Sequence, residues 1–332
     1  MSGARSSSAT ATTGIAEPPG GGYRGRFAPS PSGPLHFGSI VAAVGSFLEA
    51  RTRGGEWLVR IEDLDPPRVR PGAADGILRC LERLQLHWDG AVLRQSERTG
   101  AYLDAQQRLQ AADLLLPCRC SRARLESLAE NRGRPAGDEL FHPPSCAVAT
   151  ASGGAPAWRF RAPDRDVDFL DRVQGAHVEN VARSCGAFVV RRRDGLFAYQ
   201  LAVVVDDAAQ GITDVVRGVD LLGSTARQIL LQEALGLPRP TYMHLPLAVD
   251  ASGVKLSKSD DAAAATHSDP ASLVVATLEF LRQSPPGDLA RAGLEAVWTW
   301  ALAHWQPRRF EALKTAPVPA ASDRDARTEI SA

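Results

Sequence analysis

Two of the three lysines in this chain lie in one short segment, "GVKLSKSD" at residues 253–260, where hydroxyl side chains flank Lys255 and Lys258. Almost all other basic residues are arginines. A lysine ammonium is a compact, rotatable point charge, whereas an arginine guanidinium is a planar fork that suits a fixed carboxylate. The segment therefore favours a loop that closes on a polyphosphate over its alternative, a solvated charged turn.

A second candidate phosphate site is the segment "RFAPSPSGPLHFGSI" at residues 26–40, which joins an expected strand to an expected helix. Such a loop brings backbone N–H groups and a helix N-terminus toward one point, which favours binding of an anion. His36 can donate a hydrogen bond to a phosphate oxygen, and Gly38 lets a flat adenine ring approach the backbone. The segment has neither GxGxxG nor GxxxxGK[ST], so a plain loop with a surface histidine remains an alternative.

The elements that must position these segments alternate between strand and helix. Apolar strands are predicted over 23–30, 56–64 and 241–250, and a hairpin is predicted about Asp194 and Gly195. Helical spacing covers 39–54, 72–88, 96–115 with Ser96 as its N-cap, and 224–236 with a glycine stop. This order predicts an α/β fold with a parallel sheet and ligands at the carboxyl ends of its strands.

Composition excludes several classes of protein. Lys+Arg and Asp+Glu are 38 each, so the net charge is zero and argues against binding of nucleic acid through overall positive charge. A local basic face remains an alternative. No apolar run approaches the length of a membrane-spanning helix, and the first 22 residues lack the apolar core of a secretory signal. Five cysteines do not suggest a disulfide framework, so we expect a reducing, cytoplasmic location.

Four potential metal ligands lie close together in the sequence. Cys118 and Cys120 in "PCRCSRARL" are followed by His142 and Cys146 in "HPPSC". Three thiolates and an imidazole form a set that is usual for a structural zinc ion. The alternative is a group of ordinary reduced thiols in a loop.

Taken together, these motifs resemble a known family. "PSPSGPLHFGS" and "KLSKS" are similar to the paired HIGH and KMSKS signatures of class I aminoacyl-tRNA synthetases, and "RFAPSPSGPLHFGS" and "RIEDLDPPR" resemble the glutamyl/glutaminyl branch. The resemblance covers roughly residues 23–300. It implies a Rossmann-type parallel-sheet catalytic domain with a small zinc-containing insertion and C-terminal helices, which forms an aminoacyl-adenylate from ATP and an amino acid.

The resemblance also implies roles for individual residues. It assigns catalysis to His36, Lys255 and Lys258; ATP binding, with Mg²⁺, to Pro29, His36, Gly38, Ser39 and Lys258; and glutamate binding to Arg26, Phe27, Ala28, Pro29, Ser30, Glu62, Tyr199 and Arg217. Glu62, helped by Ser30, would accept the α-ammonium, and Arg26 and Arg217 would hold the γ-carboxylate, with Arg217 as its principal partner. When each residue is considered alone, an alternative remains: either arginine could be an ordinary exposed residue, and Tyr199 could be a half-buried residue of the core. Relatives of the zinc-binding kind carry a tyrosine where this chain has His142.

The division of the chain is also an expectation. We predict a disordered leader at 1–22, the first half of the catalytic domain at 23–116, a zinc-binding insertion at 117–157, the second half with the KLSKS loop at 158–260, C-terminal helices at 261–316 and a disordered tail at 317–332. Only 73 residues follow Ser259, which is short for the helical anticodon-binding domain of full-length glutamyl-tRNA synthetases.

In this short C-terminal segment the chain resembles the glutamyl-Q tRNA(Asp) synthetases, which lack the anticodon-binding domain. By this resemblance, they activate glutamate without tRNA and attach it to queuosine at the wobble position of tRNA(Asp). The expected partners are L-glutamate, ATP and queuosine-containing tRNA(Asp), with no membrane, and the protein is expected to be a monomer. Arginines at 119–124 and 191–193 either contact phosphates or form a solvated surface. The alternatives are a short glutamyl-tRNA synthetase that charges the 3′ end of tRNA(Glu), a non-catalytic tRNA-binding paralogue, and a general nucleotidyltransferase.

Overall fold

The structure is a computed structural model that describes residues 22–130, 141–143, 154–249 and 269–318. Lys255, Lys258 and Cys146 lie outside the described residues, as do the expected leader up to residue 21 and the tail beyond residue 318. Among the described helices, none is long and apolar enough to cross a membrane.

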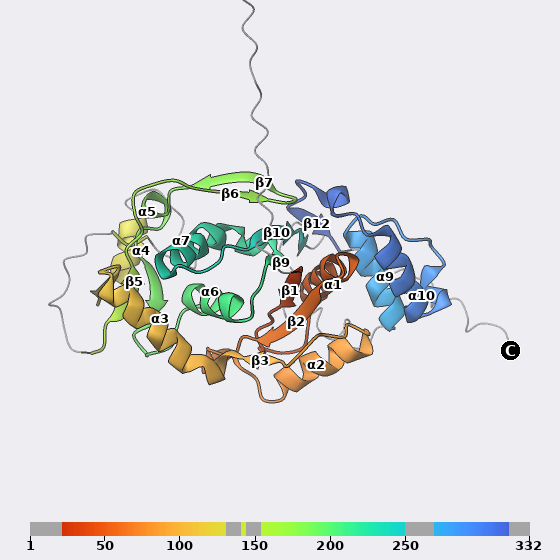
Figure 1. Ribbon diagram of the computed structural model, residues 1–332, viewed down its shortest axis with the longest axis horizontal. Coiled ribbons are helices and arrows are strands. Elements are labelled where there is room, and N and C mark those ends of the chain that lie inside the picture. The colour runs from red at the N-terminus through yellow and green to blue at the C-terminus, as the bar shows by residue number, and fades with distance from the viewer. Residues whose placement is uncertain (1–21, 131–140, 144–153, 250–268, 319–332) are drawn as a thin grey trace, which may run out of the picture.

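The centre of the molecule is a parallel sheet, as the alternation of strands and helices predicts (Figure 1). One part has the order β1-β2-β3, and the other has the order β7-β6-β10-β9, in which only the β6–β7 pair is antiparallel. The amide of Thr213 donates to the carbonyl of Arg24 at 2.9 Å and joins the two parts. The strands are β1 (Arg24–Phe27), β2 (Glu56–Ile61), β3 (Leu93–Arg94), β6 (Val167–Asp171), β7 (Gly175–Glu179), β9 (Asp214–Gly218) and β10 (Thr241–Leu245).

Helices flank this sheet and link its strands (Figure 1). Two of them follow the expected signals closely: α1 begins directly after the loop at 28–36, and α7 ends at Leu235, directly before Gly236, whose φ of 62° is left-handed. The helices are α1 (Phe37–Thr52), α2 (Ala73–Arg83), α3 (Thr99–Ala111), α4 (Arg122–Glu130), α5 (Val181–Ser184), α6 (Tyr199–Ala209), α7 (Thr225–Leu235), α9 (Pro270–Phe280) and α10 (Leu294–His304).

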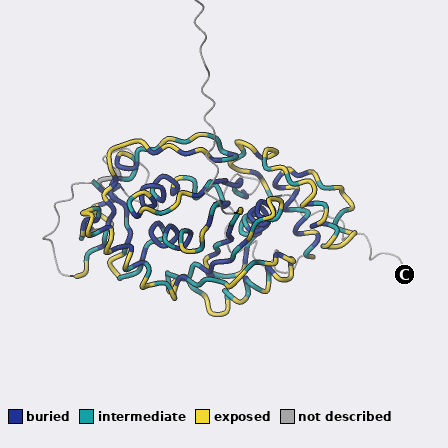
Figure 2. Tube along the Cα trace, viewed as in Figure 1, coloured by how far each residue is buried: buried dark blue, intermediate teal, exposed yellow. Residues whose placement is uncertain are grey.

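Two hydrophobic clusters support the two halves of the fold, and Figure 2 shows that buried residues concentrate on the inner helices and strands. The first cluster packs α1, β1 and β2 against α9 and α10; within it Trp298 of α10 donates from its indole nitrogen to the carbonyl of Leu84 at 2.9 Å. The second packs α6 and α7 against the small antiparallel sheet of β4 (Leu115–Cys118), β5 (Ala157–Phe160) and β8 (Phe188–Arg191).

Three local expectations are corrected. Ser96 is not the N-cap of α3, because its hydroxyl donates to Asp63 at 2.7 Å and a short 3-10 helix, η2 (Gln95–Arg98), precedes α3. The predicted hairpin turns at Asp194 and Gly195, but its second arm is reduced to a single bridge at Phe197. The strand expected over 241–250 is interrupted at Pro246, which cannot donate a backbone hydrogen bond.

The interruption at Pro246 creates a separate pair of strands. β11 (Leu247–Val249), which leads into residues 250–268, pairs in parallel with β12 (Thr315–Pro317). The C-terminal part of the described chain therefore lies beside the strand that precedes the KLSKS segment.

Candidate functional site

One cleft, with a volume of about 2060 Å³, contains every described residue to which the resemblance assigns glutamate or ATP. The walls come from the β1–α1 loop, the ends of β2 and β9 and the start of α6, so residues from both hydrophobic halves meet here. The predicted residues that line it are Arg26, Phe27, Ala28, Pro29, Ser30, His36, Gly38, Ser39, Glu62, Tyr199 and Arg217.

The β1–α1 loop is fixed against the end of β2. The amide of Glu62 donates to the carbonyl of Pro29 at 2.9 Å, and the amide of Arg70 donates to Pro31 at 2.9 Å. At the far end of the loop, the side chain of Ser39 lies 3.1 Å from Nε2 of His36, which is the N-cap residue of α1. A helix N-terminus and an imidazole therefore face the same part of the cleft, which suits an anion.

Gly38 has a different neighbour from the one the sequence suggests. A Cβ at residue 38 would lie 3.2 Å from Cε1 of His36, so this glycine leaves room for the His36 ring. The adenine contact predicted for Gly38 is untested.

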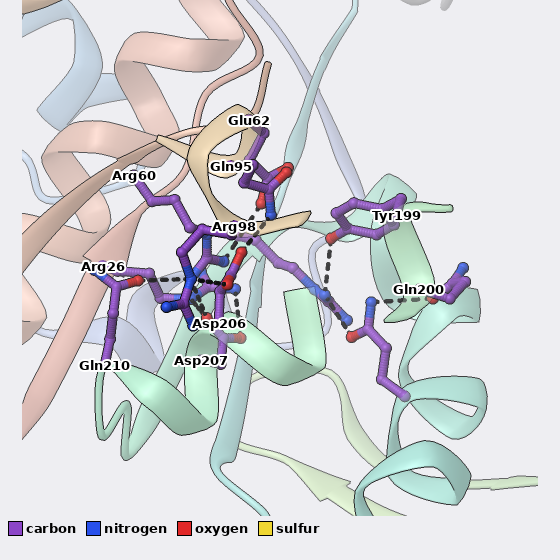
Figure 3. Close-up of polar contacts among 12 residues, drawn as sticks. Arg26, Arg60, Glu62, Gln95, Arg98, Tyr199, Gln200, Asp206, Asp207 and Gln210 are labelled. Carbon is purple, nitrogen blue, oxygen red and sulfur yellow. Dashed lines mark hydrogen bonds and ion pairs between the residues drawn. The ribbon is translucent and has the colours of Figure 1, made fainter. Parts of the chain in front are cut away.

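A buried network of charges links Arg26, which precedes the loop, to residues of β2 and α6 (Figure 3). Arg26 donates to both carboxylate oxygens of Asp207, at 3.0 and 3.3 Å, and Arg60 donates to the same carboxylate at 2.7 Å. Arg60 also contacts Gln210 at 2.8 Å and Glu62 at 3.3 Å. Burial alone raises the pKa of Asp207, but Arg26 and Arg60 outweigh this effect and hold it below its usual value. Arg26 thus already has a carboxylate partner inside the protein, which it shares with Arg60.

Glu62 is the carboxylate of this network that lines the cleft. Burial raises its pKa, and the neighbouring Arg60 and Arg26 offset only part of that effect. A carboxylate that lines a cleft at the end of a parallel strand can accept a hydrogen bond from a substrate ammonium.

We expect the raised pKa of Glu62 to appear in the pH dependence of glutamate use. An ammonium is held by the ionised carboxylate, so kcat/KM for glutamate should fall as pH decreases. The fall should begin at a higher pH than for an ordinary glutamate, whose pKa is about 4.3. The measurement is ATP–pyrophosphate exchange between pH 5.5 and 7.5, where the γ-carboxylate of free glutamate stays ionised.

Two variants control this prediction. Glu62→Gln should have a low kcat/KM for glutamate at every pH, and this value should no longer fall as pH decreases. Glu82→Gln, at an exposed position of α2, should keep the wild-type pH profile. An unchanged decline in Glu62→Gln would mean that another group causes it.

Arg217, near the end of β9, is the second arginine that the resemblance assigns to glutamate binding, and its partners differ from those of Arg26. Its side chain is 5% exposed, and among the described residues no carboxylate pairs with it. Its hydrogen-bond acceptors in the described part of the chain are all neutral groups: His244 Nε2 at 3.0 Å, Gln228 Oε1 at 2.8 Å, Thr225 Oγ1 at 2.9 Å, Tyr199 Oη at 3.2 Å and the Leu221 carbonyl at 3.3 Å.

Tyr199 is the half-buried member of this set (Figure 3). Its hydroxyl oxygen accepts from Arg217, so its own proton is available to another acceptor. Together, Arg217 and Tyr199 can hold a carboxylate.

The sequence interpretation missed the residues that hold the two arginines. Asp207 follows the apolar run "LAVVV" of its helix, and His244 lies in the largely apolar strand segment "TYMHLPL". A charged or titratable residue within an apolar run is a signal that it has a partner in the fold. The partners themselves, Arg26 and Arg217, are distant in the sequence.

Three of the four predicted metal ligands come together beside β4. The donor atoms of Cys118, Cys120 and His142 lie within 4.8 Å of one another, and all three residues are buried. Burial raises the pKa of the Cys118 thiol, but hydrogen bonds from His142 and the Cys120 amide outweigh it and lower the pKa to about 7. Two thiols and an imidazole at this spacing fit zinc; Cys146 lies outside the described residues.

The backbone holds His142 in this position. Its amide donates to the carbonyl of Cys185 at 2.9 Å, and its carbonyl accepts from Ala187 at 2.8 Å. Between these two residues, Gly186 has a φ of 72°, and a Cβ there would lie 1.8 Å from the His142 carbonyl oxygen. Only glycine permits this close approach.

Comparisons with known proteins place the chain in a family. Residues 23–284 match the family model "tRNA synthetases class I (E and Q), catalytic domain". The chain is 53% identical over 295 residues to the glutamyl-Q tRNA(Asp) synthetase of Aromatoleum aromaticum, covering 87% of this chain and 92% of that protein. It is 53% identical over 284 residues to the protein of the same name from Dechloromonas aromatica, covering 85% and 94%.

A solved structure shares the fold. The glutamate tRNA ligase of Elizabethkingia meningosepticum, in complex with its amino acid, superposes with a TM-score of 0.73 at 25% identity, covering 90% of this chain and 68% of that one. With the parallel sheet and the cleft at its carboxyl end, these findings show that the chain belongs to the class I tRNA synthetases (E and Q), among the relatives named glutamyl-Q tRNA(Asp) synthetase.

Proposed function

We propose that this protein activates L-glutamate with ATP in the absence of tRNA, and then transfers the glutamate to queuosine at the wobble position of tRNA(Asp). The observation that carries this proposal is the contrast within one cleft between Arg217, whose hydrogen-bond partners among the described residues are all neutral, and Glu62, a carboxylate whose side chain is only 9% exposed. An amino acid with a side-chain carboxylate complements both residues, because its side chain can pair with Arg217 and its α-ammonium can pair with Glu62. The names of the curated relatives support the second step.

In the proposed binding mode, Arg217 and Tyr199 hold the γ-carboxylate, and Glu62 and Ser30 hold the α-ammonium. Arg26 and the backbone of residues 27–29 complete the glutamate pocket, and Arg26 acts mainly through its hold on Asp207. A neutral glutamine amide would leave the charge of Arg217 without a counter-charge, which is a costly outcome in a buried site.

Activation joins the α-carboxylate of glutamate to the α-phosphorus of ATP. A carboxylate oxygen forms the new O–P bond, and the bond from the α-phosphorus to the bridging oxygen breaks, so that pyrophosphate leaves. His36 and the N-terminus of α1 stabilise the charge on the reacting phosphate. Lys255 and Lys258 stabilise the charge on the departing pyrophosphate. Pro29, Gly38 and Ser39 complete the ATP site. Mg²⁺ bound with ATP would neutralise part of the phosphate charge.

Transfer then requires a hydroxyl nucleophile. A hydroxyl of the cyclopentene-diol of queuosine attacks the carbonyl carbon of the glutamyl-adenylate, an ester forms and AMP leaves. The protein supplies the position of the two reactants, which lowers the barrier of such a two-substrate step.

The direct test of activation is glutamate-dependent ATP–pyrophosphate exchange without any RNA. We expect exchange with L-glutamate and little with L-glutamine. Exchange that requires added tRNA(Glu) would instead favour the alternative of a short glutamyl-tRNA synthetase, and no exchange under either condition would favour a non-catalytic paralogue.

We also propose that Cys118, Cys120, His142 and Cys146 hold one structural zinc ion in an insertion at 117–157. The three described donors support it by their mutual distances. The remaining division of the chain given above, a monomeric state and a cytoplasmic location belong to the same proposal.

Metal analysis tests the zinc site. We expect about one zinc per wild-type chain and loss of nearly all of it in Cys118→Ser and His142→Asn, because a structural site needs its full ligand set. The matched control is Cys80→Ser, a half-buried thiol in α2. Full zinc occupancy in His142→Asn would show that His142 does not replace the tyrosine of related enzymes as a ligand.

A further inference from the structure

We propose that Asp171 and His244 are positioning residues that orient Arg217 without neutralising its charge, and that they thereby set the preference for glutamate over glutamine. This inference rests on the proposed function, since it concerns the site that would bind the γ-carboxylate. Neither residue lines the cleft, so both would act through Arg217.

Asp171, at the end of β6, is a firmly held acceptor. One of its oxygens accepts from the amides of Gln174 at 2.8 Å and Val173 at 3.1 Å. The other lies 2.6 Å from Nδ1 of His244, in a pair whose side chains are both fully buried. These donors and the histidine hold the pKa of Asp171 below its usual value despite burial, so the group is a carboxylate.

This carboxylate determines which nitrogen of His244 carries the proton. An acceptor at Nδ1 requires the Nδ1–H tautomer, which leaves the lone pair of Nε2 free to accept from Nε of Arg217 at 3.0 Å. Burial, with a further contribution from Arg217, lowers the pKa of His244 to about 4, although Asp171 opposes this change. His244 is therefore neutral in the pH range in which the enzyme would work.

The result is an arginine that is oriented by hydrogen bonds but has no internal counter-charge among its described partners. Gln228 serves in the same way: its amide nitrogen donates to Gln200 at 3.1 Å, which turns its oxygen toward Arg217. Arg26 gives the opposite arrangement in the same cleft, because Asp207 binds it directly. A carboxylate in place of His244 would convert Arg217 into a second Arg26.

The hydrogen-bonded chain from Asp171 through His244 to Arg217 therefore has two separable effects, on the orientation of Arg217 and on substrate preference. Orientation depends on an acceptor near Nε of Arg217, which a neutral side chain can supply. Preference for a negatively charged substrate depends on that acceptor being neutral, because a carboxylate at this distance would compete with the γ-carboxylate for the same charge.

The test compares His244→Glu with His244→Gln in ATP–pyrophosphate exchange without tRNA, with kcat and KM measured for glutamate and for glutamine. We expect His244→Glu to lower the ratio of kcat/KM for glutamate to that for glutamine by at least about 10-fold, mainly through a higher KM for glutamate. His244→Gln should keep most of the preference, because its amide oxygen can accept from Arg217.

Gln228→Glu is the second variant and does not change the histidine. It has the same shape as the wild-type residue and places a carboxylate at the Nη1 side of Arg217, so the same loss of preference is expected. Thermal unfolding of each variant identifies those that are folded. An unchanged preference in a folded His244→Glu or Gln228→Glu, or an equal loss in His244→Gln, would overturn the inference. Absence of exchange in the wild-type protein would instead overturn the proposed function.

Discussion

Replacement of Arg217 by lysine is expected to lower kcat/KM for glutamate by roughly 100-fold, which corresponds to about 3 kcal/mol. Lysine keeps the charge but not the planar fork, so it cannot hold His244, Gln228 and a carboxylate together. Because the lost contact exists in the bound ground state, most of the change should appear in KM. Steady-state exchange with varied glutamate measures it.

Two other arginine-to-lysine changes make this result specific. Arg239→Lys, at an exposed position that contacts the Asp168 carbonyl, should leave the kinetics near wild type. Arg26→Lys should raise the KM for glutamate less than Arg217→Lys does, because Arg26 is already paired with the carboxylate of Asp207. A larger effect at Arg26 than at Arg217 would assign the γ-carboxylate to Arg26.

Replacement of His36 by alanine is expected to lower kcat for exchange by about 100-fold or more, with little change in the KM for glutamate. The imidazole lies at the N-terminus of α1, next to Ser39, where an anion is favoured, so its loss should affect the reacting phosphate. Rapid-quench measurement of adenylate formation at saturating ATP and glutamate gives this rate directly.

The matched control is His87→Ala, since His87 is exposed and precedes β3. It should behave as the wild type. If His36→Ala raised the KM for glutamate while kcat stayed constant, the imidazole would belong to the amino-acid pocket and the phosphate assignment would be wrong.

The parallel sheet and the loop between β1 and α1 could be predicted from the sequence because both depend on local patterns. Alternating apolar runs set the strands, and Gly236 stopped α7 as expected. Ser96 was misassigned for a tertiary reason: a carboxylate distant in the sequence, on Asp63, competes for its hydroxyl. Local capping rules contain no information about such a partner.

In the candidate site, too, some features follow from local sequence and others depend on residues distant in the sequence. Its cleft-lining residues lie in recognisable motifs, so Glu62, Tyr199 and Arg217 could be named from the sequence and do share one cleft. The difference between Arg26 and Arg217 could not be predicted, because it depends on Asp207 and His244, which the fold brings from other elements. A motif identifies an arginine, but only the fold shows whether its charge is already balanced.

The transfer of labelled glutamate to tRNA(Asp) tests the central claim most directly. Three substrates are compared: tRNA(Asp) with queuosine, the same tRNA with guanosine at the wobble position, and queuosine-containing tRNA(Asp) whose 3′-terminal adenosine has been removed. The account predicts label on the first and third substrates and none on the second. Labelling that requires the 3′-terminal adenosine and is indifferent to queuosine would contradict it.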